Sequence, residues 1–209
     1  MSLSMELEGF LPAGVQFTLR DPRRNYPLIG AEQQAVARAV TKRKNEFSAG
    51  RDGARASLAA LGVALCEIPV GVRRAPVWPD GICGSITHSA HLCIALAARK
   101  IEIASIGIDA EPDAPLKPEL RSAILHESEL HVSGAEAIAL FSMKEALFKA
   151  LFPISGEMMG FHDAKSDGAS TLTLTRDIGV FKAGEGFKVS TLHSENHVIS
   201  FCALPGGNE

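Results

Sequence analysis

The chain has 209 residues, 24 of them acidic and 21 basic, and a formal net charge of −3. A chain of this length can bury a substantial core as one domain or as two small lobes, and its balanced charge argues against a general nucleic-acid-binding surface. The four cysteines lack the density and spacing of a disulfide scaffold, so we expect reduced thiols. The sequence shows no evident secretory signal and no apolar stretch of transmembrane length. We therefore expect a cytoplasmic protein that does not bind membranes.

In chain order, the first half is predicted to hold a strand, two helices and a long loop. Residues 15–19 alternate weakly between apolar and polar side chains, as in a strand. Apolar residues at helical spacing indicate a helix that begins near Ala31. A second helix over about 51–61 is expected to end at Gly62, because glycine readily adopts the left-handed conformation that caps helices. Prolines and glycines between 69 and 81 then indicate a long irregular connection, and such loops are often functional.

The middle and the end of the chain alternate between strands and helices. Three candidate strands are predicted at 84–89, 92–98 and 105–111. Their spacing favours an antiparallel meander. Two helices follow, near 119–125 and over about 135–152, and we expect Pro153 to stop the longer one because proline has no amide donor. Further strands are predicted at 171–175, 186–192 and 197–204, the last two forming a hairpin around the Ser-Glu-Asn sequence at 194–196.

The order of these elements, helix then strands in each half, predicts the α+β class. No sequence repeat at a fixed period accompanies the similarity of element order. We assign residues 1–104 to an N-terminal half and residues 105–209 to a C-terminal half. The first five residues, which include a second methionine, are left out of the fold assignment.

Two acidic clusters together offer three carboxylates and a lysine. Asp109 and Glu111 lie two apart on a candidate strand and share a face, where adjacent like charges are unfavourable without a cation. On the longer helix, Glu145 lies one turn before Lys149. Each cluster alone has a plain interpretation, a solvated strand end or a surface ion pair. If the strand and the helix pack together, their oxygen ligands suit a hard divalent cation beside a positive charge, which fits a phosphate ester or a pyrophosphate.

Basic residues are concentrated in the first half of the chain. A solvated helix face is one interpretation and an anion site is the other. His88 ends the sequence Gly84-Ser85-Ile86-Thr87-His88 and is either a structural residue or an anion contact, since small neighbours leave room and hydroxyl groups supply donors. The basic residues in question are Arg38, Lys42, Arg43, Lys44, Arg51, Arg55, Arg73 and Arg74.

Lys144 is unusual because its helical angle places it inside the apolar arc of the longer helix. Either its stem packs while its ammonium reaches solvent, or it is a partly buried partner of a carboxylate or a phosphate. The histidines show no metal-ligand spacing, so zinc is not expected. The sequence contains no P-loop, dinucleotide-binding fingerprint or nucleophile elbow.

Three motifs resemble, in order, spacing and residue type, those of the Sfp-type 4′-phosphopantetheinyl transferases. They are Gly84-Ser85-Ile86-Thr87-His88, Gly107-Ile108-Asp109-Ala110-Glu111, and Phe141-Ser142-Met143-Lys144-Glu145 with Lys149. The upstream segments 42–47 and 74–81 are similar to the siderophore-synthesis branch, whose members are like enterobactin synthetase component D. The resemblance covers residues 42–153. Phe141 stands where many family members carry tryptophan, and it matches the siderophore branch.

The resemblance implies two similar α+β halves with pseudo-two-fold symmetry, a monomer, and an active site at the interface of the halves. The implied reaction is Mg²⁺-dependent transfer of the 4′-phosphopantetheine arm of coenzyme A to a serine of an acyl, peptidyl or aryl carrier protein, with release of adenosine 3′,5′-bisphosphate. Residues 113–132 are the expected docking region for the carrier. A Mg²⁺-dependent nucleotide phosphohydrolase, which would not need the crowd of arginines, and a non-catalytic coenzyme A-binding module are the alternatives.

The resemblance also implies a role for each matching residue. Asp109, Glu111 and Glu145 would be the Mg²⁺ ligands. Lys149 would contact the pyrophosphate and offset charge on the leaving phosphate. The base that takes the serine proton would be Glu145 or a metal-bound hydroxide. The coenzyme A phosphates would be bound by Thr87 and His88, by Arg43 and Arg51 at the 3′-phosphate, and by Arg55 and Arg73 as helpers.

Overall fold

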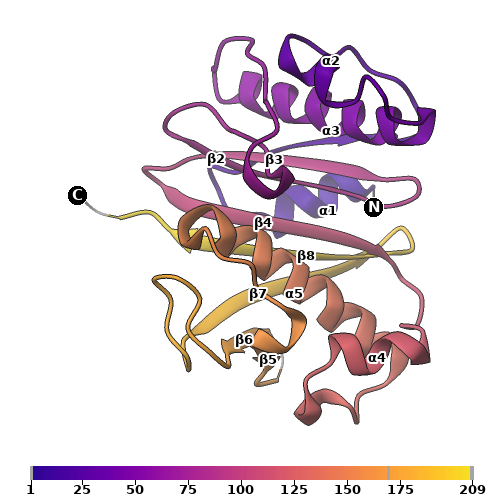
Figure 1. Ribbon diagram of the computed structural model, residues 1–209, viewed down its shortest axis with the longest axis vertical. Coiled ribbons are helices and arrows are strands. Elements are labelled where there is room, and N and C mark those ends of the chain that lie inside the picture. The colour runs from indigo at the N-terminus through magenta and orange to yellow at the C-terminus, as the bar shows by residue number, and fades with distance from the viewer. Residues whose placement is uncertain (1, 169, 208–209) are drawn as a thin grey trace. The chain divides into compact units, whose positions relative to one another are not determined.

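The computed structural model describes residues 2–168 and 170–207 and contains two antiparallel sheets with helices, which confirms the α+β class. The chain divides into two compact units (Figure 1). We call Leu11–Ile106 with Pro205–Glu209 the N-terminal unit, and Met1–Phe10 with Gly107–Leu204 the C-terminal unit. The structure describes each unit by itself, so the expectation that the active site lies at their interface stays a prediction.

The N-terminal unit is a three-stranded sheet covered by one long helix. The strands β1 (Gln16–Arg20), β2 (Ile82–His88) and β3 (Cys93–Arg99) are antiparallel in the order β1-β3-β2. Helix α3 (Thr41–Ala60) lies against all three strands (Figure 1). Glycines on α3 permit this close approach, because a Cβ atom at residue 53 would lie 3.2 Å from the Cβ atom of Ala95. The core between α3 and the sheet is formed by Ala54, Leu58, Ile68, Ile82, Ala95 and Ala97.

The helices of the N-terminal unit differ from the sequence prediction. Helix α2 (Ala31–Ala35) is short, and α3 begins ten residues ahead of the predicted second helix, at Thr41 rather than Arg51. The buried face of α3 is made largely of alanine, glycine and serine, so the apolar periodicity that marks a helix is weak there. The predicted cap at Gly62 is confirmed, since Gly62 has φ +77° and its amide donates to the Ala59 carbonyl at 2.9 Å.

The C-terminal unit is a five-stranded sheet with the order β4-β8-β7-β6-β5. Its strands are β4 (Ile103–Pro112, which begins in the N-terminal unit), β5 (Ala164–Ser166), β6 (Thr171–Leu174), β7 (Gly186–Ser194) and β8 (His197–Pro205). Its helices are α1 (Leu3–Phe10), α4 (Pro118–Ile124) and α5 (Gly134–Ser155). It also contains the short 3₁₀ turns η2 (Glu127–Glu129) and η3 (Phe161–Asp163), whereas the turn η1 (Val72–Arg74) belongs to the N-terminal unit. Helix α5 packs on β6 and β7 (Figure 1).

The predicted three-stranded meander is wrong. β2 and β3 form an antiparallel hairpin as expected, but β4 pairs with β8 in the other sheet. Spacing along the chain cannot reveal this change of sheet, because a strand that is buried on both faces has the same pattern in either sheet. The predicted terminal hairpin is confirmed: Glu195 and Asn196 have φ +47° and +62°, as a two-residue turn between twisted strands requires.

Two further expectations for the C-terminal unit are corrected. The first five residues belong to the fold, because α1 buries Leu3 and Leu7 and its Leu3 amide donates to the Glu195 carboxylate at 3.1 Å. Helix α5 runs past Pro153 to Ser155 and ends at Gly156, which has φ +65°. A proline in the last turn removes one amide donor but leaves the residues after it free to complete the turn, so the stop comes from the glycine.

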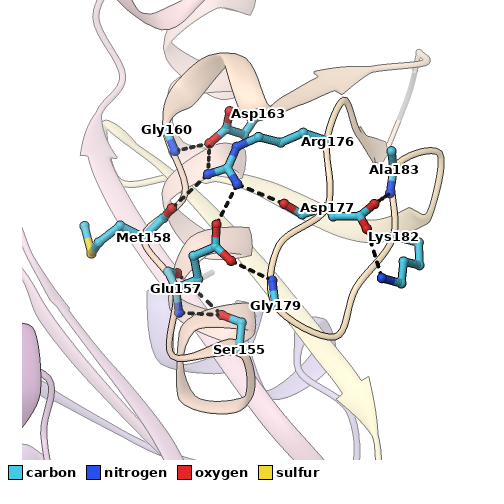
Figure 2. A network of polar contacts seen from close by, with 10 residues as sticks. All are labelled: Ser155, Glu157, Met158, Gly160, Asp163, Arg176, Asp177, Gly179, Lys182 and Ala183. Carbon is cyan, nitrogen blue, oxygen red and sulfur yellow. Dashed lines mark hydrogen bonds and ion pairs between the residues drawn. The ribbon is translucent and has the colours of Figure 1, made fainter.

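A charged network holds the chain segments that follow α5 (Figure 2). Arg176 donates to the carboxylates of Glu157 at 2.6 Å and Asp163 at 2.8 Å, and to the Met158 carbonyl at 3.1 Å. One guanidinium thereby ties the loop after α5 to the loop after β6. Across the described part of the chain, no helix is both long and apolar enough to cross a membrane.

Candidate active site

The site in the C-terminal unit depends on a close contact between β4 and α5. At Gly107 on β4, a Cβ atom would overlap the Ala146 carbonyl oxygen and lie 2.7 Å from the Ala150 amide nitrogen. Both are backbone atoms of α5, so they cannot move aside without moving the helix. Only glycine therefore permits this separation, and the side chains that follow Gly107 on β4 are brought against α5.

Lys149 of α5 contacts β4 directly. Its Nζ donates to Asp109 Oδ1 at 2.6 Å and to the Ile108 carbonyl at 3.1 Å. Asp109 is only 3% exposed, so the expectation that it sits at a solvated strand end is wrong. Ile106 and Ile108 are fully buried as expected, but Asp109 is buried as well, so both faces of β4 are covered here. The strand and the helix thus pack together, as the cation-site interpretation of the two acidic clusters required.

Two further carboxylates share the electrostatic environment of Asp109 and Lys149. Burial raises the pKa of Glu111 to about 7, the charge of Asp109 adds to the effect, and Lys149 opposes it. Burial also raises the pKa of Glu145, with Lys149 opposing and Asp109 adding. The structure therefore brings together all four residues that the two acidic clusters offered, with Ser142 buried one turn before Glu145 on α5.

These residues fit a hard divalent cation by their chemistry. Half-buried carboxylates with raised pKa values carry a charge that burial disfavours, and a bound cation would relieve that cost. Within the described residues, no three His, Cys, Asp or Glu side chains already stand as a metal-binding group. Mg²⁺ is commonly held by one or two carboxylates, substrate phosphates and water, so this ion does not need a full set of protein ligands.

Burial of Glu111 makes the stability of the protein depend on pH. Its pKa is about 7 when folded, against an ordinary value of 4.5, so the charged carboxyl costs stability that is absent below about pH 4.5 and fully felt above about pH 7. Because the side chain is partly exposed, we expect Glu111→Gln to raise the Tm of the metal-free protein by only ~2–4 °C at about pH 8, or ~1 kcal/mol, and to leave it unchanged at about pH 4.5. Equal gains at both pH values in calorimetry would contradict this cause.

Positive charge gathers in the N-terminal unit. Arg43 Nη1 lies 3.5 Å from His88 Nε2, which joins the start of α3 to the end of β2. Arg51, two turns further along α3, is 5% exposed, and its guanidinium stacks on the Phe47 ring at 4.5 Å. Burial lowers the pKa of Arg51 to about 10, Glu32 opposes the shift, and the charges of Arg43 and Arg55 add to it. Such a concentration of cationic groups suits a multiply charged anion.

The other predicted phosphate contacts of the N-terminal unit differ in their surroundings. Thr87 is buried on β2, immediately before His88. Arg55 donates to the Glu32 carboxylate and to the Pro27 carbonyl, each at 2.5 Å, so both of its terminal nitrogens are engaged within the protein. Arg73 is exposed in the long loop and has φ +54°, in the left-handed region that non-glycine residues seldom adopt.

Lys144 has a buried carboxylate partner, so the interpretation in which its ammonium reaches solvent is wrong. The side chain is 1% exposed, and its Nζ donates to Glu129 at 2.6 Å and to the Ile124 carbonyl at 2.9 Å. Glu129 also accepts from the backbone amides of His126 and Ser166. Neither Glu129 nor Glu32 was predicted as a buried residue, because a single acidic residue in a polar stretch carries no pattern that marks it as buried.

These two groups of residues suit phosphate ligands, with carboxylates and a lysine in one unit and arginines and a histidine in the other. A family model for the 4′-phosphopantetheinyl transferase N-terminal domain matches residues 31–98. A second model, for the 4′-phosphopantetheinyl transferase superfamily, matches residues 105–202. The two matches cover the basic residues and the carboxylates respectively.

Two similar proteins are named 4′-phosphopantetheinyl transferases, and a third is named enterobactin synthase component D. The chain is 35% identical to 4′-phosphopantetheinyl transferase Npt of Nocardia iowensis over 200 residues, covering 90% of this chain and 84% of the relative. It is 39% identical to 4′-phosphopantetheinyl transferase Svp of Streptomyces mobaraensis over 165 residues, 75% of this chain and 65% of the relative. It is 35% identical to enterobactin synthase component D of Salmonella typhimurium over 147 residues, 66% and 58% of the two chains. The chain belongs to the 4′-phosphopantetheinyl transferase family.

Proposed function

We propose that this enzyme transfers the 4′-phosphopantetheine arm of coenzyme A to a serine of a carrier protein. The serine oxygen forms a bond to the phosphorus that bears pantetheine, and the bond from that phosphorus to the bridging oxygen breaks. Adenosine 3′,5′-bisphosphate leaves with that oxygen, and the serine proton passes to a base. The observation that carries the proposal is the contact of Lys149 with Asp109 beside two carboxylates whose pKa values are raised.

The C-terminal unit would act on the pyrophosphate. Asp109, Glu111 and Glu145 would hold Mg²⁺, which when bound offsets the negative charge of the pyrophosphate. Lys149 would stabilise the charge that builds on the leaving phosphate. Glu145 would also be the base that takes the serine proton, because a carboxylate beside the reacting phosphate can accept it. The attacking serine belongs to the carrier, so the chain needs no nucleophile of its own.

The N-terminal unit would bind the other end of coenzyme A. Arg43, Arg51 and His88 would bind the 3′-phosphate, because a guanidinium can donate two hydrogen bonds to phosphate oxygens. The 3.5 Å approach of Arg43 Nη1 to His88 Nε2 supports this assignment, because two side chains this close together can both contact one phosphate group. Thr87 would add a hydroxyl donor, and Arg73 would contact the same ligand from the long loop.

The role of His88 can be tested with two ligands. His88→Ala should weaken binding of coenzyme A by about tenfold, the loss expected for one charge-assisted contact, and leave binding of 3′-dephospho-coenzyme A unchanged. Titration calorimetry with both ligands measures the difference. Equal losses for the two ligands would show that His88 does not contact the 3′-phosphate.

Several expectations from the sequence stay predictions. They are the monomeric state, the cytoplasmic location, and a carrier protein of acyl, peptidyl or aryl type in siderophore, polyketide or nonribosomal peptide synthesis. Docking of the carrier on residues 113–132 is supported by exposed Leu120 and Leu130 in that segment. Arg121, in the same segment, is engaged within the protein, because it donates to the carbonyls of Leu130 and Val132.

Nucleotide release separates the proposed reaction from the alternatives. The enzyme with coenzyme A and Mg²⁺ should release adenosine 3′,5′-bisphosphate only when a carrier protein is added, in a one-to-one ratio to modified carrier. A phosphohydrolase would cleave coenzyme A without the carrier. A coenzyme A-binding module would release no nucleotide in either case, and either of these results would overturn the proposal.

A further inference from the structure

Glu32 is a fully buried carboxylate in the N-terminal unit, outside the residues assigned to the substrate. It accepts hydrogen bonds from the amides of Ile68 at 2.9 Å and Ile29 at 3.1 Å, and from Arg55 Nη1 at 2.5 Å. A buried ion pair is favourable only when its remaining polar atoms are satisfied, and here both carboxylate oxygens are used. Glu32 therefore fixes three separate segments of the chain at one point.

Residue Ile68 connects this buried pair to Arg51. Its amide donates to Glu32, and its carbonyl accepts from Arg51 Nε at 2.7 Å. The Phe47 ring lies on one face of the same guanidinium, 4.5 Å away. Arg51 is thus fixed through its Nε and its face, and within the described residues no group accepts a hydrogen bond from its Nη1 or Nη2. These two nitrogens are the pair that a phosphate would use.

Arg55 lies one turn after Arg51 on α3, yet its guanidinium is directed elsewhere. It binds Glu32 and the Pro27 carbonyl, with Asp52 Oδ1 3.7 Å from its Nη2. Three arginines close together repel one another, and among the charges that act on Arg51, Glu32 is the one that opposes this repulsion. Glu32 therefore supplies a balancing charge, and its pair with Arg55 supplies a mechanical anchor.

We propose that Glu32 and Arg55 are positioning residues for Arg51, which they hold with its two terminal nitrogens available to the 3′-phosphate of coenzyme A. This inference rests on the proposed function, because it takes coenzyme A as the ligand of Arg51. It assigns Arg55 a role through Arg51 instead of the direct phosphate contact expected from the sequence. It also brings Glu32, on a different helix, into the binding of coenzyme A.

The test compares two ligands by titration calorimetry, which requires no turnover. Glu32→Gln keeps the size of the side chain and an acceptor for the Ile68 amide, but removes the charge. We expect it to weaken coenzyme A binding by about tenfold, as for a misaligned charge-assisted contact. Binding of 3′-dephospho-coenzyme A should change less than about twofold, because the phosphate that Arg51 would bind is missing.

Glu67 offers a matched control beside Ile68. Its carboxylate accepts from the Ala31 amide at 2.7 Å and, among the residues that the structure describes, makes no hydrogen bond to an arginine. Glu67→Gln should therefore leave the affinity for both ligands unchanged. In an Arg51→Ala background, Glu32→Gln should cause less than about twofold further loss, because the residue it positions is gone.

Arg55→Lys keeps the inference testable if Glu32→Gln does not fold. It retains a positive charge opposite Glu32 but cannot reach Glu32 and the Pro27 carbonyl together, so we expect about threefold weaker binding of coenzyme A alone. Equal losses for both ligands, losses that add to that of Arg51→Ala, or unchanged affinity in a folded variant would each overturn the inference. If the parent binds coenzyme A but modifies no carrier, the proposed function fails and the positioning role can still hold. A parent that binds no coenzyme A refutes both.

Discussion

Asp109→Ala should lower kcat/KM for transfer by about 10³-fold or more, comparable to the loss of a principal electrostatic contact in an active site. Asp109 has two roles in the proposed reaction, as an oxygen ligand of Mg²⁺ and as the partner that places Lys149 Nζ at 2.6 Å. Removal of one side chain would therefore disturb the cation and the lysine together. Steady-state rates at saturating Mg²⁺ measure the effect.

Stability should respond much less than activity to this substitution. Lys149 keeps its contact with the Ile108 carbonyl at 3.1 Å and is 24% exposed, so water can solvate its ammonium. We expect a Tm loss of ~2–4 °C, or about 1 kcal/mol. Asp177→Ala is the control, since this acid also pairs with a lysine, Lys182 at 2.9 Å, but lies in the loop after β6, and transfer should stay within about twofold. Near-normal transfer by folded Asp109→Ala would rule out the assigned role.

Gly107→Ala should destabilise the protein by about 3 kcal/mol, a Tm loss of ~6–12 °C. The added methyl group would overlap the Ala146 carbonyl oxygen and approach the Ala150 amide, and both atoms belong to the backbone of α5. Relief would require α5 to move away from β4, which would also separate Lys149 from Asp109. Activity should therefore fall even at temperatures where the variant stays folded.

Gly9→Ala provides a comparison for Gly107→Ala. Gly9 lies in α1, and a Cβ atom there meets no heavy atom within 4 Å. This change should leave stability unchanged or raise it by ~0.5–1 kcal/mol, because alanine favours a helix. Thermal unfolding of both variants measures the difference. A Gly107→Ala protein as stable as the parent would show that β4 and α5 do not pack as closely as described.

The strand and helix that carry the carboxylates were predictable because their patterns are strong. Alternation along β4 placed Ile106 and Ile108 in the core, and one-turn spacing placed Glu145 beside Lys149. The cap at Gly62 followed from the conformational freedom of glycine, and the hairpin at Glu195 and Asn196 followed from a short polar turn between two predicted strands. Such features depend on the spacing and conformational preferences of neighbouring residues, which a short stretch of sequence contains.

Features that depend on distant partners could not be predicted in the same way. The pairing of β4 with β8 joins strands far apart in the chain, and nothing within either strand specifies its neighbour. The length of α3 was underestimated because its buried face consists of small residues rather than large apolar ones. Burial of Glu32 and Glu129 depends on Arg55 and Lys144, and only the folded structure shows which acid meets which base.

The mass of a carrier protein after incubation with the enzyme, coenzyme A and Mg²⁺ tests the central claim most directly. The carrier should gain the mass of one phosphopantetheine group, and a carrier whose acceptor serine is replaced by alanine should gain none. Chelation of Mg²⁺ should prevent the gain, and excess Mg²⁺ should restore it. No mass gain across a panel of acyl, peptidyl and aryl carriers, with enzyme that is folded and binds coenzyme A, would contradict the proposed reaction.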